Sequence, residues 1–228
     1  MKITYKDSGI LKHYSIDEEL KLVHELEKDE VIIRFWQVEA VLLGKLDTVL
    51  PKYEEGKQFL IDNGYKVEIR KQGGLAIVSD CDNLNMTFCF KASDFKDLHK
   101  PYQCVAKYIV DVLSEMGLKV DIKSIDDSYC PGDYDLSVNG VKFAGIAQYR
   151  NKEAIIVGVS LFVKGDQSKR SQLIKDFYDI TEARNSTRQN YPVIDIESMG
   201  TLSDLLEESL DIDVVKNVFM ASNIHICE

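Results

Sequence analysis

Residues 135–164 constrain the fold of this 228-residue chain most strongly, because apolar and polar residues alternate along almost the whole stretch. Two turn signals, Asn139-Gly140 and Asn151-Lys152, divide the stretch into three runs. Asn-Gly between alternating runs is the strongest short-range hairpin signal, since both residues tolerate a positive φ. We therefore expect three consecutive antiparallel strands over residues 136–138, 141–150 and 154–164.

The rest of the chain mixes helix and strand patterns without a regular βαβ alternation. Apolar residues at helical spacing predict helices over residues 16–29, 53–63, 101–117, 168–178 and 202–218. Runs of β-branched and apolar residues predict strands over residues 31–36, 40–43, 65–70, 75–79, 84–90 and 118–125. Ser15-Ile16-Asp17-Glu18 has the form of a capping box at the first helix. We predict a mixed α+β fold in a single domain, residues 1–228, because no linker-like stretch divides the chain.

The net charge of −10 argues against bulk electrostatic attraction to nucleic acid or to an anionic membrane, and we expect neither as a partner. Local basic clusters are the candidates for meeting an acidic partner, with scattered solvated charges as the alternative. They are Lys2, Lys6 and Lys12; Arg70 and Lys71; and Lys164, Lys169 and Arg170. No run approaches the roughly 20 apolar residues of a membrane helix, and the first residues lack an apolar signal region. A cytoplasmic location is therefore expected.

Five cysteines are scattered along the chain, without a Cys-x-x-Cys pair or a histidine at metal-ligand spacing, so neither a disulfide framework nor a metal site is predicted. Cys81, Cys89 and Cys104 fall in strand or helix patterns typical of inert core cysteines. Cys130 differs, because it begins the turn Cys130-Pro131-Gly132-Asp133, and loops often carry catalytic groups. Cys130 is therefore a candidate thiol nucleophile, with inert packing as the alternative.

Lys142 follows the Asn139-Gly140 turn, so the predicted hairpin returns it towards the Cys130 loop. A cation near a thiol favours the reactive thiolate, and this makes Lys142 a candidate catalytic partner. The alternative is a lysine at a strand edge, in contact with water. Asp133 and Asp135 would oppose a thiolate if they pointed towards it, so we expect them to cap backbone amides of the loop.

The run Arg70-Lys71-Gln72-Gly73-Gly74 is a second candidate site, because two glycines between strands permit a close backbone approach to a ligand. A structural Gly-Gly hairpin is the alternative, and the spacing matches neither a P-loop nor a dinucleotide-binding motif. Asp82-Asn83-Leu84-Asn85 adds polar groups at a strand start, or else forms a simple turn. None of the four histidines lies next to a cysteine in the sequence.

Taken in order, Arg70-Lys71-Gln72-Gly73-Gly74-Leu75, Asp82-Asn83-Leu84-Asn85, the run from Ser128 to Ser137 and Val141-Lys142-Phe143-Ala144-Gly145 resemble the lipoate/biotin protein ligase superfamily. The resemblance runs from about residue 34 to the C-terminal helix. Ser-Tyr-Cys-Pro-Gly-Asp-Tyr-Asp-Leu-Ser followed by Lys-Phe-Ala-Gly-Ile is most similar to its amidotransferase branch. This branch moves octanoyl groups from the glycine-cleavage H protein.

The resemblance implies a ligase-type catalytic domain with mixed, largely antiparallel sheets flanked by helices. It implies transfer of an octanoyl or lipoyl group from a lysine of the H protein to a lysine on the lipoyl domain of a 2-oxoacid dehydrogenase E2 subunit. Cys130 would carry the acyl thioester and Lys142 would favour its thiolate, with no cofactor. The substrate-binding residues implied are Arg70, Gly73, Gly74, Leu75, Asn85 and Gly145. We further expect an apolar acyl tunnel beneath Gly73-Gly74, with Leu75, Ile77 and Val138 in its walls.

Departures from related motifs leave three alternatives. ATP-dependent lipoate ligases usually carry a third glycine where Leu75 stands and a histidine where Ser79 stands, so adenylate formation is not favoured. The late Asn-Pro-Cys-Gly type motif of octanoyl-carrier-protein transferases is absent, although a related class combines an early cysteine loop with that donor. The third alternative is a non-catalytic scaffold that binds lipoyl domains.

Overall fold

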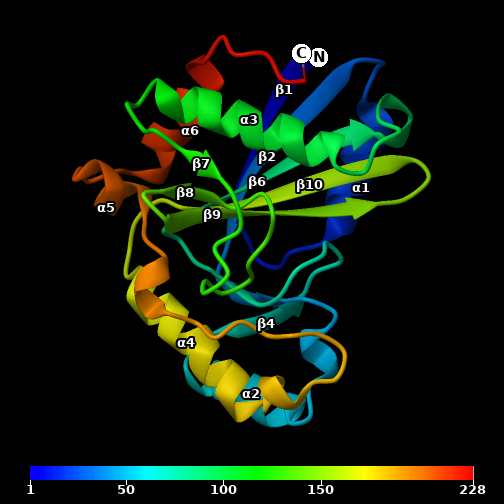
Figure 1. Cartoon of the computed structure of the whole chain (residues 1–228). Coiled ribbons are helices and arrows are strands. Elements are labelled where there is room, and N and C mark those ends of the chain that lie inside the picture. The colour runs from blue at the N-terminus through cyan, green and yellow to red at the C-terminus, as the bar shows by residue number, and fades with distance from the viewer. Residues whose placement is uncertain (228) are drawn as a thin grey trace.

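The computed structural model describes residues 1–227, which form two sheets and their covering helices (Figure 1). The seven-stranded sheet has the order β1-β2-β6-β10-β9-β8-β7 and the three-stranded sheet the order β4-β3-β5. The strands are β1 (Lys2–Leu11), β2 (Glu30–Val38), β3 (Ala40–Leu43), β4 (Lys66–Ile69), β5 (Ile77–Ser79), β6 (Asn83–Lys91), β7 (Asp121–Ile122), β8 (Leu136–Val138), β9 (Val141–Arg150) and β10 (Ala154–Phe162). Two strand pairs, β1 with β2 and β3 with β4, are parallel, and the other strand pairs within residues 1–227 are antiparallel. The predicted mixed α+β architecture is confirmed.

Helices cover both faces of the large sheet because its central strands carry apolar side chains on both faces. The helices are α1 (Ile16–Glu25), α2 (Tyr53–Asp62), α3 (Lys100–Ser114), α4 (Gln167–Ile180), α5 (Leu202–Leu206) and α6 (Ile212–Ala221). On β2, Ile33 and Phe35 pack in one cluster with α3 and α6, whereas Ile32 packs on the other side with α1. A strand that is buried on both faces is consistent with a central position in the sheet.

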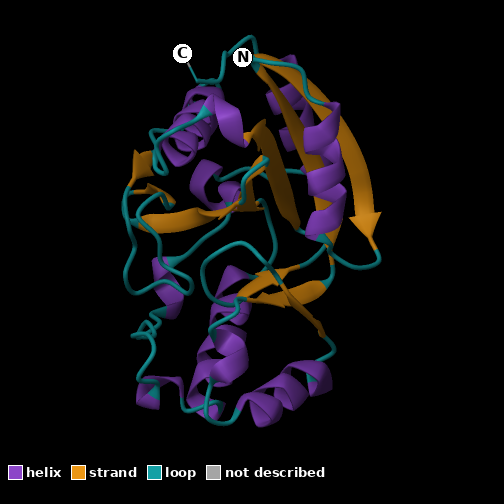
Figure 2. Ribbon diagram, turned by 90° about the vertical axis from the view of Figure 1, so that its right-hand side faces the viewer, coloured by secondary structure: helices purple, strands orange, loops and turns teal. Residues whose placement is uncertain are grey.

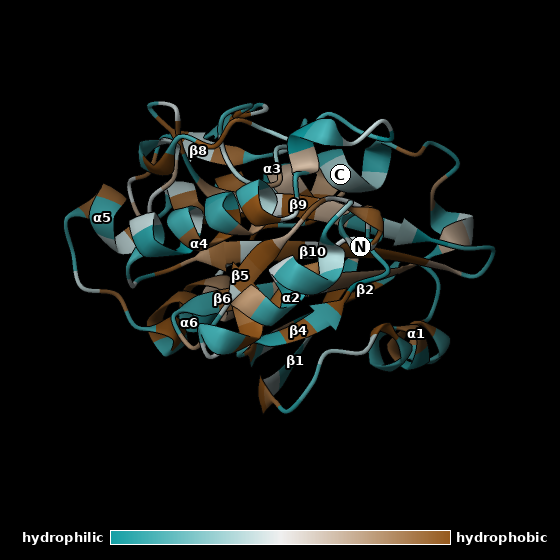
Figure 3. Ribbon diagram, turned by 90° about the horizontal axis from the view of Figure 1, so that it is seen from below, coloured by the Kyte–Doolittle hydropathy of each residue, from teal (hydrophilic) through white to brown (hydrophobic). Residues whose placement is uncertain are grey.

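The small sheet and its helices form a second layer below the large sheet (Figure 2). Residues of β3 and β5 share a buried cluster with α4 and with Leu60 of α2. Seen from below, α2 and α4 show largely hydrophilic surfaces while the strands behind them are hydrophobic (Figure 3). The same cluster contains Trp36 and Val38 of β2 and Phe162 of β10, so it joins the two sheets beside the site described below.

The predicted hairpin between residues 136 and 164 is confirmed. Val138 pairs with Val141 across the turn, where Asn139 and Gly140 have φ of 51° and 85°. Positive φ at both central residues is the requirement of a tight type I′ connection, and Asn-Gly meets it at low cost. Strands β8, β9 and β10 are neighbours in the large sheet, as expected.

Several predicted boundaries are wrong. The helix expected over 202–218 is two helices, because Glu207 ends α5 in the left-handed conformation and Asp211 begins the next helix. The strand expected over 118–125 is only β7, and α1 ends at Glu25 rather than near Asp29. The side chain of Ser15 accepts from the Asp17 amide, without the reciprocal bond of a capping box. Strand β1 had no counterpart in the prediction.

The local basic clusters are mostly neutralised by nearby acids. Lys2, Lys6 and Lys164 form ion pairs with Glu30, Glu25 and Asp211, and Arg170 pairs with Asp80. No helix within residues 1–227 is long and apolar enough to cross a membrane.

Candidate active site

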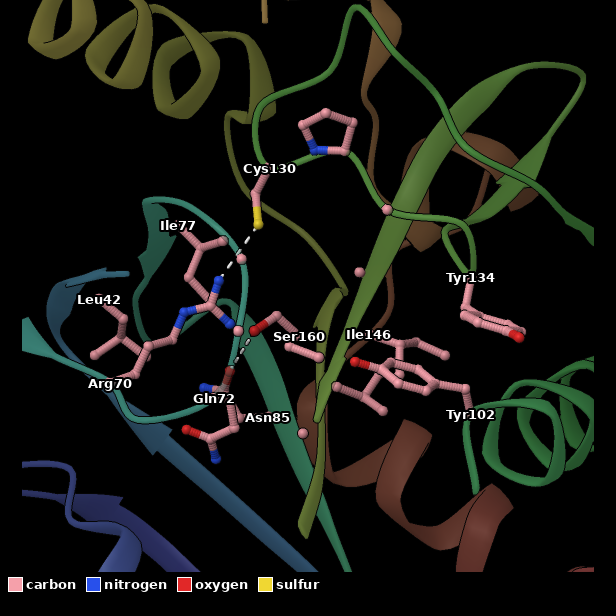
Figure 4. Close-up of a pocket in the computed structure, with 18 of the residues that line it drawn as sticks. Leu42, Arg70, Gln72, Ile77, Asn85, Tyr102, Cys130, Tyr134, Ile146 and Ser160 are labelled. Atoms are coloured by element: carbon pink, nitrogen blue, oxygen red, sulfur yellow. Dashed lines mark hydrogen bonds between the residues drawn. The ribbon is translucent and has the colours of Figure 1, made fainter. Parts of the chain in front are cut away.

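A cavity of about 280 Å³ lies between the two sheets and is lined by residues from loops and strands far apart in the sequence (Figure 4). On β9 and β10 its wall contains the small residues Gly145, Ala147 and Gly158, which leave space for a ligand beside the strands. Its apolar side chains include Trp36, Leu42, Ile77, Ile146, Val159 and Phe162. The cavity can therefore take a narrow apolar group.

Cys130 lies in the loop between β7 and β8 and lines this cavity, half-buried. Its Sγ accepts hydrogen bonds from the backbone amide of Leu75 at 3.1 Å and from Nη2 of Arg70 at 3.3 Å. The backbone of Cys130 has φ of 50°, a conformation uncommon for a residue with a side chain. The loop thus presents the sulfur to two hydrogen-bond donors. A nucleophilic role for Cys130 stays a prediction.

Gly74 is what allows the sulfur and the guanidinium to meet. It has φ of +96°, and a Cβ placed on it would lie 2.9 Å from Sγ of Cys130 and 2.7 Å from Nη2 of Arg70. Both distances are shorter than real Cβ contacts, so a side chain at this position would displace one group or the other. The second glycine of the predicted motif therefore provides a close approach, and the approaching group is the chain's own cysteine loop.

Lys142 is brought beside the Cys130 loop by the hairpin, as predicted, and only 1% of its surface is exposed. Its Nζ donates to the carbonyl oxygens of Cys130 (2.8 Å) and Tyr129 (3.2 Å) and to Oγ of Ser128 (3.2 Å). It also pairs with Oδ2 of Asp135 at 3.0 Å. Within residues 1–227 no hydrogen bond joins Nζ to Sγ, so Lys142 is near the cysteine but contacts its backbone. A catalytic role for Lys142 stays a prediction.

Asp135 caps the loop as expected. Its Oδ2 accepts from the amides of Gly132 (3.1 Å) and Ile125 (3.4 Å). Burial raises the pKa of the Asp135 carboxyl, and the Lys142 ammonium acts against that rise by favouring the ionised form. Asp133, by contrast, is exposed. One buried ion pair therefore fixes both the carbonyl and the amide groups of the cysteine loop.

The other predicted substrate-binding residues divide into two groups. Gly73, Gly74, Asn85 and Gly145 line the cavity, with Asn85 held by Ser79 and Ser160 through its amide. The side chain of Leu75 does not line it but is buried in the cluster that β3 and β5 share with α4, and this residue contributes its backbone amide instead. Of the expected tunnel walls, Ile77 lines the cavity, whereas Val138 does not line it and packs against the cluster that contains residues of α3 and α6.

Three features of the cavity had no counterpart in the prediction. Tyr14 stacks on Trp36 at 4.9 Å, and its hydroxyl accepts from Nε2 of Gln72. Tyr102 and Tyr134 stack at 4.8 Å on the side opposite Arg70 (Figure 4). His99 also lines the cavity and hydrogen-bonds Tyr134. These pairs join residues at least 20 positions apart, so only Gln72, inside the Gly-Gly motif, carried a local signal.

A buried acid supports the floor beneath the Gly-Gly loop. Asp47 accepts from the amide of Gly44 at 2.7 Å and from the hydroxyl of Tyr178 at 3.2 Å. Tyr178 in turn accepts from the amide of Ala76, next to Leu75. Burial raises the pKa of Asp47 to about 6, although these donors and Arg70 favour its ionised form.

Comparison with known proteins places this geometry in a family. The sequence profile of the "Lipoyl protein ligase A/B catalytic domain" matches residues 10–223. The chain belongs to this family. The structure is similar to that of lipoate-protein ligase A bound with ATP, with a TM-score of 0.71 and 17% identity, covering 96% of this chain and 82% of that one. The family and the ligase-type fold expected from the motifs are confirmed.

Curated relatives of the family are similar over most of the chain. An "Octanoyl-[GcvH]:protein N-octanoyltransferase" of Macrococcus caseolyticus is 36% identical over 82% of this chain and 69% of the relative. A relative of the same name from Oceanobacillus iheyensis is 33% identical, over 92% and 76%. A "Lipoyl-[GcvH]:protein N-lipoyltransferase" of Listeria monocytogenes is 37% identical, over 79% and 66%. The names of these relatives and the family's catalytic domain support an acyltransferase activity for this protein.

Proposed function

We propose that this protein moves an octanoyl group from a lysine of the glycine-cleavage H protein to a lysine on the lipoyl domain of an E2 subunit, through a thioester on Cys130. The observation that carries the proposal is the sulfur of Cys130 in the wall of an apolar cavity, with two hydrogen-bond donors directed at it. The names of the relatives at 33–36% identity give the donor protein and the acyl group.

The proposed reaction has two half-reactions. The thiolate of Cys130 attacks the carbonyl carbon of octanoyl-lysine on the H protein, the lysine amine leaves, and the thioester remains on the sulfur. The uncharged acceptor lysine then attacks the thioester and takes the octanoyl group as an amide. Because one lysine amide replaces another, the free-energy change of the net reaction is near zero. The transfer therefore needs neither nucleotide nor metal. Lys142 belongs to this machinery by holding the loop that carries the nucleophile.

The cavity walls suit an eight-carbon acyl chain. Each methylene buried from water contributes about 0.8 kcal/mol, so a short saturated chain gains several kcal/mol from an apolar channel. Leu42, Ile77 and Phe162 provide apolar surface, and Gly145 and Gly158 provide space. Donor and acceptor proteins must reach the same sulfur in turn, which requires a modest, transient interface rather than a stable complex.

Intact-mass measurement of the acyl-enzyme tests the proposal. Incubation with octanoylated H protein is expected to add one octanoyl group to Cys130, and addition of unmodified lipoyl domain is expected to remove it. Cys130→Ser abolishes the thioester, whereas Cys81→Ser, which changes an exposed cysteine outside the cavity, keeps it. No octanoyl mass from any donor would overturn the covalent mechanism.

The same experiment separates the rivals by donor. Acylation by octanoyl-carrier protein alone would replace the H protein as donor. Modification of the lipoyl domain from free octanoate, ATP and magnesium, with Cys130→Ser fully active, would establish a ligase instead. Equal binding of lipoyl domains by wild type and Cys130→Ser, with no acyl transfer, would establish a scaffold.

One relative favours a second acyl group, because its name gives lipoyl in place of octanoyl. Parallel reactions with octanoylated and lipoylated H protein decide between the two. The larger value of kcat/KM identifies the cargo, because the same acceptor and the same nucleophile serve both.

A further inference from the structure

The cation that touches the sulfur of Cys130 is Arg70. Its Nη2 lies 3.3 Å from Sγ and 2.7 Å from the carbonyl oxygen of Leu75, which aligns the guanidinium towards the sulfur. Only 8% of the Arg70 surface is exposed, so water screens its charge little. The amide of Leu75 approaches the same sulfur at 3.1 Å. One full charge and one backbone dipole therefore converge on Sγ.

Lys142 lies on the other side of the cysteine, where its donors are already used. An ammonium group has three N–H donors, and four oxygen atoms surround this one. They are the carbonyl oxygens of Cys130 and Tyr129, Oγ of Ser128 and Oδ2 of Asp135. The charge of Lys142 is thus balanced by Asp135, and its hydrogen bonds fix the backbone of the loop.

We propose that Arg70 and the backbone amide of Leu75 form the thiolate and oxyanion site of Cys130, and that Lys142 is a positioning residue. The inference rests on the proposed acyl transfer, and it assigns separate roles in that site to Arg70 and Lys142. A guanidinium is permanently charged and presents several donors in a fixed plane, so it can contact the sulfur and a neighbouring oxygen together. Lys142 acts through the backbone of Cys130.

The proposed step is balanced in atoms and charge. The thiol loses its proton to water, and the thiolate held by Arg70 attacks the amide carbonyl carbon. As the S–C bond forms, the carbonyl π electrons move to oxygen, and this oxyanion takes the hydrogen bonds that the sulfur gives up. Collapse of the intermediate breaks the C–N bond, and the leaving nitrogen regains a proton from water. The products are a thioester on Cys130 and a free lysine amine.

Gly74 provides independent support for this assignment. Any side chain there would lie within 3 Å of both the Arg70 guanidinium and the Cys130 sulfur, so the position is kept open for their contact. Gly44 contacts the other side of this loop closely, because a Cβ on Gly44 would lie 2.0 Å from the Gly74 carbonyl oxygen. The Gly-Gly loop therefore packs closely against Gly44, directly after strand β3, and places the Leu75 amide at the sulfur.

Residue-specific alkylation tests the proposal without any acyl donor. Iodoacetamide is neutral and iodoacetate is anionic, so the ratio of their rates at Cys130 reports the local charge, with mass spectrometry of peptides as the readout. Arg70→Gln is expected to lower the iodoacetamide rate at neutral pH about tenfold, because the sulfur loses a charged hydrogen-bond donor that lies 3.3 Å away. It also lowers the preference for iodoacetate, and Arg70→Lys retains part of both effects.

The matched control removes the other cation with its counter-charge. The double variant Lys142→Gln with Asp135→Asn leaves a neutral amide donor near the Cys130 carbonyl. It is expected to keep the wild-type iodoacetate preference. Fully buried Cys89 reports folding in every variant, since it reacts only in unfolded protein. A wild-type rate and ratio in Arg70→Gln, with a lost preference in the double variant, would overturn the inference and make Lys142 the cation.

Octanoyl transfer provides the second readout. Arg70→Gln is expected to slow acylation of Cys130 by octanoylated H protein by at least about 100-fold, more than its effect on alkylation, because the oxyanion also loses a donor. Equal losses in both assays would overturn the oxyanion role. If wild-type protein takes no octanoyl group from any donor, the proposed function fails, while the alkylation result still decides whether Arg70 activates Cys130.

Discussion

The two walls of the cavity are built in opposite ways. The loop wall carries Cys130 and Gly74, both with positive φ, together with the buried pair of Lys142 and Asp135. The strand wall, on β9 and β10, is regular backbone with small residues at Gly145 and Gly158. Reactivity thus depends on polar contacts that hold an uncommon conformation, whereas ligand size depends on missing side chains. The two walls should respond differently to mutation.

The largest effect is expected from breaking the ion pair behind the loop wall. Lys142→Met leaves the Asp135 carboxylate buried without its cation, and we expect the free energy of unfolding to fall by about 3–5 kcal/mol in denaturant titrations. Adding Asp135→Asn is expected to recover most of this loss, because the unpaired charge is removed. A single-variant loss below about 1 kcal/mol would show that the pair does not stabilise the loop.

A pH effect comes next, from the acid beneath the same wall. The carboxyl of an aspartate ordinarily has a pKa of 3.8, but burial raises the pKa of Asp47 to about 6. The folded state therefore binds this proton more tightly than the unfolded state does. Its contribution to stability is complete below about pH 4 and is lost as pH rises through about 6, a change of about 2–3 kcal/mol. Urea titrations of wild type and Asp47→Asn should show this difference between pH 4 and 7. Parallel pH profiles for the two proteins would contradict it.

Mutation of the strand wall should change the stability of the protein little. It should change the preference for acyl-chain length. A Cβ on Gly158 would make only ordinary contacts, the nearest being 3.7 Å from Nε2 of Gln72, so Gly158→Val is expected to fold. If it excludes two methylenes, kcat/KM for octanoyl transfer falls about 10- to 20-fold, at about 0.8 kcal/mol per methylene. A butanoyl donor is the internal control and should be little affected. Equal losses for both donors would indicate that Gly158 does not border the acyl chain.

The smallest effect is expected at the aromatic end of the cavity. Tyr14→Phe keeps the stacking on Trp36 but removes the hydroxyl that accepts from Gln72. Loss of one such hydrogen bond costs about 1 kcal/mol, which we expect as about a fivefold rise in KM for the octanoylated donor, with kcat nearly unchanged. A fall in kcat with an unchanged KM would instead connect Tyr14 to the chemical step.

Local patterns predicted most of the strands and the position of Lys142 near the Cys130 loop. The Asn139-Gly140 turn placed Lys142 beside the Cys130 loop because a two-residue hairpin leaves little choice of register. Strand β1 had a local signal in the alternation of Ile3 and Tyr5, yet its pairing is with β2, 28 residues away. The break between α5 and α6 was missed because apolar spacing continues through it, while Glu207 leaves the helix.

Residue types at short spacing were sufficient to predict the family motifs, the mixed fold and the candidate nucleophile. The identity of the cation that meets the sulfur depends instead on contacts between distant segments. Arg70 and Cys130 are 60 residues apart, and their contact depends on the Gly-Gly loop and the cysteine loop being held face to face. Lys142, nearer in the sequence, points its donors at the backbone instead, because burying an ammonium requires oxygen partners and Asp135 provides the charge.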